Sequence, residues 1–175
     1  FNVREGLTWN DGEDLTIDDV VFSYNFMLEA NPGAYAGTLN PITEVKKGSG
    51  DWDVNMRMNK PIGTYASSQL QLPILPEHKW GDVDAGEFQQ YEPQKNGGPV
   101  GLGPGVITKY EPDTATEISY ADREGEYVLN DLDWMEDVNG IISGGPFVES
   151  IRLKIYGSTA AMEQALLQGE LDTIY

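Results

Sequence analysis

The sequence contains no cysteine and only one histidine, His78, among its 175 residues. Without cysteine, disulfide bonds, thiol nucleophiles and cysteine-bound metals are excluded, although this absence does not fix the cellular compartment. A metal site would have to be built from His78 and carboxylates alone. No G-x-S-x-G element surrounds His78, so nothing supports a Ser/His/Asp triad. We therefore expect no enzymatic activity, no cofactor and no metal, and we expect His78 to cap or pack at a helix start.

The chain is also poor in positive charge, with 11 Lys and Arg residues against 29 Asp and Glu residues and a net charge of −18. It has no stripe of Lys or Arg, which argues strongly against binding to nucleic-acid phosphates. The acidic residues are scattered through every segment, and this favours a hydrated, self-repelling surface over a site for a cationic ligand. Because concentrated salt screens such repulsion, we interpret the acidity as halophilic and favour a haloarchaeal source.

Long apolar runs are missing as well, so no segment is long enough to span a bilayer. The apolar residues instead follow short periodic patterns. Residues 1–4 alternate like a strand, and Asn10-Asp11-Gly12 predicts a turn. A helix is predicted from Ile17 to Glu29, with Thr16 as its N-cap and Asp19 as the capping-box partner.

The rest of the chain predicts a mixture of strands and helices. The expected strands cover residues 51–61, 106–110, 117–121, 151–155 and 171–174, and the expected helices cover residues 65–72 and the stretch from Ser158 to Gly169. We expect Tyr65 to lie in the core. The polar stretch 87–99 predicts a loop and marks a domain boundary.

Two oxygen-rich clusters invite comparison with metal loops. Asp51-x-Asp53-x-Asn55 begins like a calcium loop, but Met56 stands where such a loop needs Gly, and Ile62 stands where it needs Glu. A strand is therefore the better interpretation. The acidic residues between 131 and 140 fit no metal loop, and we interpret them as a solvated acidic loop.

Five blocks of the sequence resemble, in the same order, the extracellular solute-binding proteins of family 5, the receptors of ABC importers for peptides, nickel and oligosaccharides. Each block alone is weak, but their shared order is a strong signal. The blocks are FNVREGLTWNDGEDLTIDDVVFSYNFML (1–28), DWDVNMRMNKP (51–61), PILPEHKW (73–80), PVGLGP (99–104), and IRLKIY (151–156) followed by AAMEQALLQGELD (160–172).

The resemblance implies an α/β (mixed α+β) fragment of a two-lobed, type II periplasmic-binding-protein-like fold. Residues 1–98 would form the small extra domain of the first lobe, and residues 99–175 would form part of the main sheet of that lobe. Because family members are much longer, the second lobe is expected to be absent from this sequence. Any membrane attachment would come from an anchor outside it, as in a lipoprotein.

The resemblance also points to ligand-binding residues. Tyr35 stands where peptide-binding relatives place an aromatic side chain near the ligand, although ordinary packing is an equal alternative. Gly101, Leu102 and Gly103 match a loop that runs along the cleft between the lobes. This loop fits no phosphate-binding motif. Leu102 replaces the usual Thr and Gly105 replaces the usual aromatic residue, which leaves mainly backbone groups as binding candidates.

The function implied is a receptor that closes by a hinge around a solute, most often a peptide, and delivers it to the permease subunits of an ABC importer. Such a receptor would work outside the cell or at its surface. A nickel-chelate or oligosaccharide receptor is the alternative within the family. A peptide-sensing or surface interaction protein, or a hydrolase, is the alternative from another class.

Overall fold

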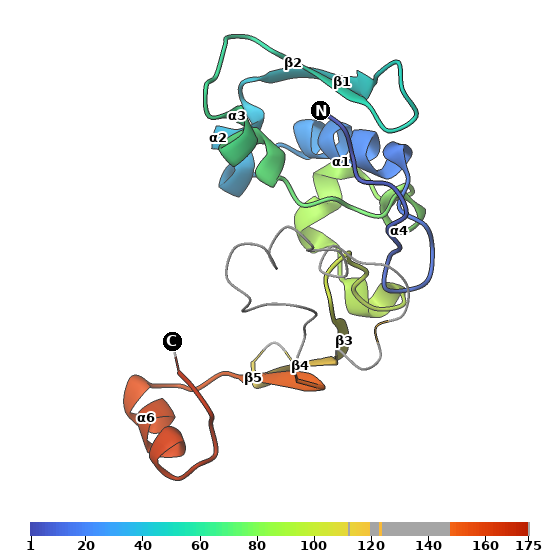
Figure 1. Ribbon diagram of the computed structural model, residues 1–175. Helices are drawn as coiled ribbons and strands as arrows, with labels where there is room; N and C mark the ends of the chain where they lie inside the picture. Colours follow the sequence, from blue (N-terminus) through green and yellow to red (C-terminus); the bar gives the residue numbers. More distant parts are fainter. Residues whose placement is uncertain (112, 120–122, 124–147, 175) are drawn as a thin grey trace, which may run out of the picture.

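The computed structural model of the chain describes residues 1–111, 113–119, 123 and 148–174 (Figure 1). They form helices, strands and short 3-10 turns (η), so the predicted mixed α and β composition is confirmed. In chain order the elements are α1 Ile17–Ala30, η1 Gly33–Tyr35, α2 Ala36–Leu39, β1 Ile42–Lys47, β2 Val54–Met58, α3 Tyr65–Ser68, η2 Gln69–Gln71, α4 Glu77–Trp80, η3 Ala85–Gln90, η4 Pro93–Asn96, β3 Val106–Glu111, β4 Ala115–Ser119, β5 Ser150–Lys154 and α6 Thr159–Leu167.

Helix α1 is the central element of the chain before residue 100 (Figure 1). The β1–β2 hairpin packs along one side of this helix, and α4 and η3 pack along the other. Their buried residues form one hydrophobic cluster, in which Trp9, Met27 and Val54 are at most 1% exposed. One continuous core therefore joins the first segment of the chain to the helix and to the hairpin.

Both ends of α1 agree with the sequence prediction. The Thr16 hydroxyl accepts a hydrogen bond from the Asp19 N–H, and the Asp19 carboxylate accepts one from the Thr16 N–H at 2.8 Å. This reciprocal pair is the predicted capping box. At the other end, Asn31 adopts a left-handed conformation with φ of 42° and stops the helix.

Two buried polar side chains of α1 fix the segment that leads into α4. The Ser23 hydroxyl accepts a hydrogen bond from the Leu75 N–H at 2.7 Å and donates one to the Asp19 carbonyl at 2.5 Å. The Asp19 carboxylate accepts a bond from the Glu77 N–H at 2.8 Å. These bonds satisfy buried and partly buried polar groups, so they tie residues 75–77 to the helix.

Tyr24 makes a third buried polar contact from α1. Its hydroxyl donates to the Gln69 carbonyl at 2.9 Å, and the side chain is 2% exposed. Burial disfavours the phenolate and raises the pKa of Tyr24 to about 12.

The hairpin pairs β1 with β2 in antiparallel fashion, with a bulge between Ile42 and Glu44. It confirms the predicted strand 51–61 over the residues of β2, whereas β1 was not predicted. The segment 1–3 runs along the other edge of β2, but it forms only a single bridge, from Asn2 to Asp53. The prediction of a strand at residues 1–4 was therefore wrong, because too few residues run side by side to build a ladder.

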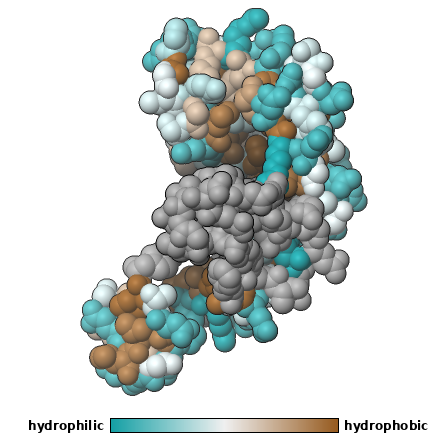
Figure 2. Space-filling model, in the orientation of Figure 1, coloured by the Kyte–Doolittle hydropathy of each residue, from teal (hydrophilic) through white to brown (hydrophobic). Residues whose placement is uncertain are grey.

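A second antiparallel sheet has the order β3–β4–β5. It confirms the predicted strands at 106–110 and 151–155 to within two residues. The third predicted strand, 117–121, lies at Ala115–Ser119, and residues 120 and 121 are outside the described part of the chain. Ile151 and Leu153 of β5 are 39% and 42% exposed, and apolar atoms also gather on the visible face of α6 (Figure 2).

Helix α6 is capped by Ser158, whose hydroxyl accepts a hydrogen bond from the Ala161 N–H at 3.2 Å. Gly169 follows its last turn with φ of 73°, as predicted. Residues 171–174 do not form the predicted strand, because no strand in the described ranges pairs with them.

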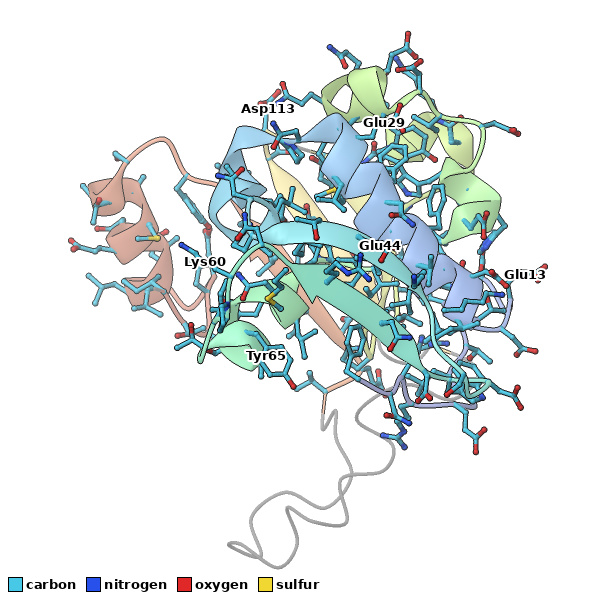
Figure 3. The ribbon with its side chains drawn as sticks, turned by 90° about the horizontal axis from the view of Figure 1, so that it is seen from above. Glu13, Glu29, Glu44, Lys60, Tyr65 and Asp113 are labelled. Carbon is cyan, nitrogen blue, oxygen red and sulfur yellow. The ribbon has the colours of Figure 1, made fainter. Side chains whose placement is uncertain are left out.

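Two further expectations were wrong. Tyr65 is not a core residue: its side chain lies on the outside of α3 and is 44% exposed (Figure 3). The stretch 87–99 is not a simple loop, because η3 and η4 occupy much of it.

Candidate functional site

The structure does not bring the predicted binding residues into one place. Tyr35 ends η1, which follows the C-terminal end of α1, whereas Gly101 bonds to Asn10, which precedes the N-terminal end of that helix. Helix α1 has 14 residues and spans about 20 Å. Tyr35 and the loop Gly101–Gly103 are therefore two separate candidate contacts, one on the segment that follows α1 and one against the segment that precedes it.

Tyr35 is half-buried and packs against the edge of the hydrophobic cluster. Its backbone N–H donates to the Pro32 carbonyl at 2.9 Å, which holds the short turn before α2. A half-buried aromatic ring suits ordinary packing as well as a ligand contact. The role of Tyr35 in binding stays a prediction.

The loop Gly101–Gly103 lies against the turn that follows Trp9. The Asn10 N–H donates to the Gly101 carbonyl at 3.1 Å, and the Gly101 N–H donates to the Asn10 side-chain oxygen Oδ1 at 3.2 Å. The side-chain nitrogen Nδ2 of Asn10 also donates to the Pro99 carbonyl at 3.5 Å. Asn10 therefore contacts the loop with its backbone and with both ends of its side-chain amide.

Arg123 joins the same two segments from another direction. Its guanidinium donates to the carbonyls of Gly103 at 3.1 Å, Trp9 at 3.4 Å and Thr8 at 2.5 Å. The residue is only 8% exposed. Burying a guanidinium is costly unless its donors are satisfied, and these carbonyl contacts satisfy several of them.

A charged cluster lies on the other side of the turn. The Asp11 carboxylate is 2.9 Å from Nε2 of His78 and 3.4 Å from Nζ of Lys79. The His78 ring also meets the Trp9 ring edge-on, with the ring centroids 6.4 Å apart. The prediction that His78 packs at the start of a helix is confirmed, since it lies in the first turn of α4.

Asp11 has a perturbed pKa. Partial burial on its own raises the pKa, but hydrogen bonds from His78 and Lys79, the charge of His78 and the Glu13 N–H outweigh that effect and lower it. The carboxylate of Asp11 is thus held in its charged form and ties α4 to the turn.

We expect Asp11→Asn to reduce the free energy of unfolding by about 1 kcal/mol at pH 7, because it weakens a partly exposed, charge-assisted contact. A lowered pKa in the folded state means that the stabilisation is fully present above the unfolded pKa and is lost as the pH falls through the folded one. The difference between wild type and variant should therefore shrink below about pH 4.

Urea unfolding at pH 7 and at pH 3 checks this expectation. Asp14→Asn is the matched control, because Asp14 is an exposed aspartate on the same segment with no ion pair among the described residues. A difference between wild type and Asp11→Asn that stays constant with pH would contradict it.

Two surface hollows lie away from these residues. One of about 280 Å³ is lined by residues that include Asp82, Glu87 and Tyr91, and another of about 290 Å³ is lined by residues that include Phe22 and Glu29. Both are open, shallow depressions beside η3, and neither includes Tyr35 or the loop Gly101–Gly103. They offer no enclosed space for a small ligand.

Sequence reasoning missed Asn10 and Arg123 as residues of this site. Asn10 was assigned only to a turn, and its side-chain contacts to Pro99 and Gly101, 89 and 91 positions away, leave no local trace in the sequence. Arg123 belongs to no periodic pattern. The scarcity of basic residues is the one signal that could have singled it out.

The acidic stretch 131–140 lies outside the described residues. Within the described ranges, no group of three or more His, Cys, Asp or Glu side chains is arranged to hold a metal ion. In the same ranges, no helix combines the length and apolarity that crossing a membrane requires.

Comparison with known proteins matches the whole chain to one protein family. Residues 1–175 match the profile of bacterial extracellular solute-binding proteins, family 5 middle. The oligopeptide-binding protein AppA of Bacillus subtilis is 24% identical over 172 residues, which are 97% of this chain and 28% of that protein. The chain therefore spans less than a third of the length of this relative.

Solved structures agree on the fold. AppA of Bacillus subtilis in complex with a nonapeptide superposes with a TM-score of 0.73 at 23% identity, over 97% of this chain and 30% of that one. NikZ of Campylobacter jejuni in complex with Ni(L-His) superposes with a TM-score of 0.71 at 18% identity, over 98% of this chain and 30% of that one. The mannohexaose-bound periplasmic oligopeptide-binding protein of Thermotoga maritima superposes with a TM-score of 0.70 at 23% identity, over 98% of this chain and 29% of that one.

Proposed function

Because the chain belongs to the extracellular solute-binding proteins of family 5, we propose that the whole protein is a receptor that binds a peptide outside the cell and delivers it to an ABC importer. The match of all 175 residues to the family carries this proposal. AppA, a relative over almost the entire chain, is an oligopeptide-binding protein, and this similarity favours a peptide as the solute.

The proposed mechanism is closure of two lobes around the solute, without covalent chemistry. Residues 1–98 would be the small extra domain of the first lobe, and residues 99–175 would be part of its main sheet. Tyr35 and the loop Gly101–Gly103 would face the solute from this lobe. Permease subunits would be the partners, and an anchor elsewhere in the protein would hold the receptor at the cell surface.

Free backbone groups of the loop suit a peptide. Among the residues that the structure describes, the N–H and C=O of Leu102 and the N–H of Gly103 have no hydrogen-bond partner. Such groups can pair with the backbone of a peptide regardless of its side chains, as an added strand does. This supports a receptor with broad tolerance for peptide sequence.

Two other solute classes stay open within the family. NikZ was solved with Ni(L-His), and the Thermotoga maritima protein was solved with mannohexaose. A metal chelate or an oligosaccharide is therefore the second candidate. A peptide sensor without a transport role, or a hydrolase, is the candidate from another class, and neighbouring genes for a permease and an ATPase would favour the importer.

Native mass spectrometry of the full-length protein, purified without denaturation, tests the proposal. We expect a mass excess that fragments into peptides. An excess that corresponds to a metal chelate or to a sugar would replace the peptide with the second candidate. Hydrolysis of added peptide, lost on His78→Ala, would overturn the receptor function.

We also propose that the acidic composition adapts the protein to concentrated salt. The net charge of −18 makes the folded chain repel itself, and molar salt screens charges beyond about 3 Å. We expect the melting temperature to rise between dilute buffer and about 2 M KCl, because salt at molar concentration screens this repulsion. A melting temperature that stays flat or falls would rule out the halophilic interpretation.

A further inference from the structure

We propose that Asn10 and Arg123 are positioning residues that hold the loop Gly101–Gly103 in the shape in which it meets the solute. This inference rests on the proposed function, because it assumes that the loop is part of the binding surface. It goes beyond that function by assigning roles to two residues that need not touch the solute.

The contacts of Asn10 need both ends of its side chain. Its backbone N–H and its Oδ1 atom pair with the carbonyl and the N–H of Gly101, and Nδ2 reaches the Pro99 carbonyl. Alanine would lose both side-chain bonds. Aspartate would keep an acceptor for the Gly101 N–H but would turn an anionic oxygen toward the Pro99 carbonyl.

Arg123 holds the other end of the loop. Its Nε donates to the Gly103 carbonyl, while its terminal nitrogens donate to the carbonyls of Thr8 and Trp9. The planar guanidinium can reach both segments at once because its donors are fixed in a fork. A lysine at this position would offer one nitrogen and could not bridge all three carbonyls.

These contacts leave the middle of the loop available. The carbonyl and N–H of Gly101 are used by Asn10 and the carbonyl of Gly103 is used by Arg123, whereas the backbone groups of Leu102 and the N–H of Gly103 have no partner in the described ranges. The Leu102 side chain packs against the hydrophobic cluster. The loop is thus fixed on both flanks and by its side chain, and it presents backbone groups between them.

Neither the packing nor the backbone explains why residues 101 and 103 are glycines. A Cβ atom on Gly101 or Gly103 would meet no atom within 4 Å, and neither residue has a positive φ. Glycine is also used where another molecule must approach the backbone closely. Glycine at both positions leaves room for a solute to approach the backbone closely.

Hydrogen exchange on the full-length protein tests the positioning role without any ligand. We expect Asn10→Ala and Arg123→Met to speed exchange of two amides by about tenfold or more, with other segments unchanged. These are the Gly101 N–H, which bonds to Asn10 Oδ1, and the N–H of residue 10, which bonds to the Gly101 carbonyl. Asn10→Asp should restore part of the protection at Gly101. The control is Asn59→Ala, which removes one exposed side-chain bond to the Asn40 carbonyl in a different loop. Unchanged exchange at the amides of residues 10 and 101 in both variants would overturn the proposal.

Binding supplies the second measurement, with an equimolar mixture of nonapeptides with free termini as the probe. We expect Asn10→Ala to weaken the affinity for the nonapeptides by about tenfold. We expect Gly101→Ala and Gly103→Ala to weaken this affinity as well, without lowering the melting temperature. Uptake at wild-type strength by all three variants would overturn the proposal. If wild type itself takes up no nonapeptide, the peptide function fails, and the exchange measurement still decides the positioning role.

Discussion

Replacing Trp9 with alanine should lower the free energy of unfolding by about 4 kcal/mol, the largest effect that we expect from a single substitution in this chain. Trp9 is 0% exposed and belongs to the cluster that joins the first segment to α1 and the hairpin. Truncation removes the transfer energy of an indole and leaves a cavity that close-packed neighbours fill only in part. Urea unfolding monitored by circular dichroism measures the loss.

Two variants make this expectation specific. Trp52→Ala removes the same side chain from a half-buried position on the hairpin, so its cost should be well below that of Trp9→Ala. Trp9→Phe should recover most of the loss, because the indole Nε1 has no hydrogen-bond partner among the described residues. Equal losses for Trp9→Ala and Trp52→Ala would contradict the central place of Trp9 in the core.

The second large effect is expected for Asp19→Ala, with a loss of about 3 kcal/mol. The Asp19 carboxylate is buried and accepts hydrogen bonds from the Thr16 N–H, the Thr16 hydroxyl and the Glu77 N–H, each at 2.8 Å. Alanine would leave two backbone donors without acceptors and would break the capping box and the link to α4 together. The unfolding midpoint in urea reports the change.

Asp18→Ala is the matched control, since Asp18 is the neighbouring acidic residue in the same first turn of α1. Its carboxylate is 57% exposed and pairs with Lys47 at 2.6 Å. An exposed ion pair contributes about 1 kcal/mol at most, and both aspartates share the favourable interaction with the helix end. A loss for Asp18→Ala as large as that for Asp19→Ala would mean that helix-end charge, not the buried bonds, accounts for the effect.

Helices α1 and α6 were predicted well because their signals are local, whereas only Tyr65–Ser68 of the expected helix 65–72 is α-helical. One end of α1 is determined by Thr16 and Asp19, and the other end by Asn31. At each end the bonded atoms lie within four residues of one another. The ends of α6 are determined in the same way by Ser158 and Gly169. Strand β1 was missed because the bulge between Ile42 and Glu44 interrupts the alternation of buried and exposed residues. A period of two is then no longer visible in the sequence.

The candidate site was predicted less completely than the fold. The resemblance to the family singled out Tyr35 and the loop Gly101–Gly103, and no observation on this chain tests their contact with a solute. Asn10 reaches Gly101 across 91 positions, and Arg123 reaches Gly103 across 20 and Thr8 across 115, so no local pattern in the sequence contains these partners. Such contacts are set by tertiary structure alone.

The long reach of Arg123 has a consequence for the order in which the chain folds. The Arg123 guanidinium bonds to the Thr8 carbonyl 115 residues earlier. At a synthesis rate of about 5–20 residues per second, Arg123 follows Thr8 by roughly 6 to 23 seconds. The hairpin and α1 need only nearby residues and can form within that interval. The segment that contains Thr8 and Trp9 therefore acquires its bonds to Arg123 only after the hairpin and α1 can have formed.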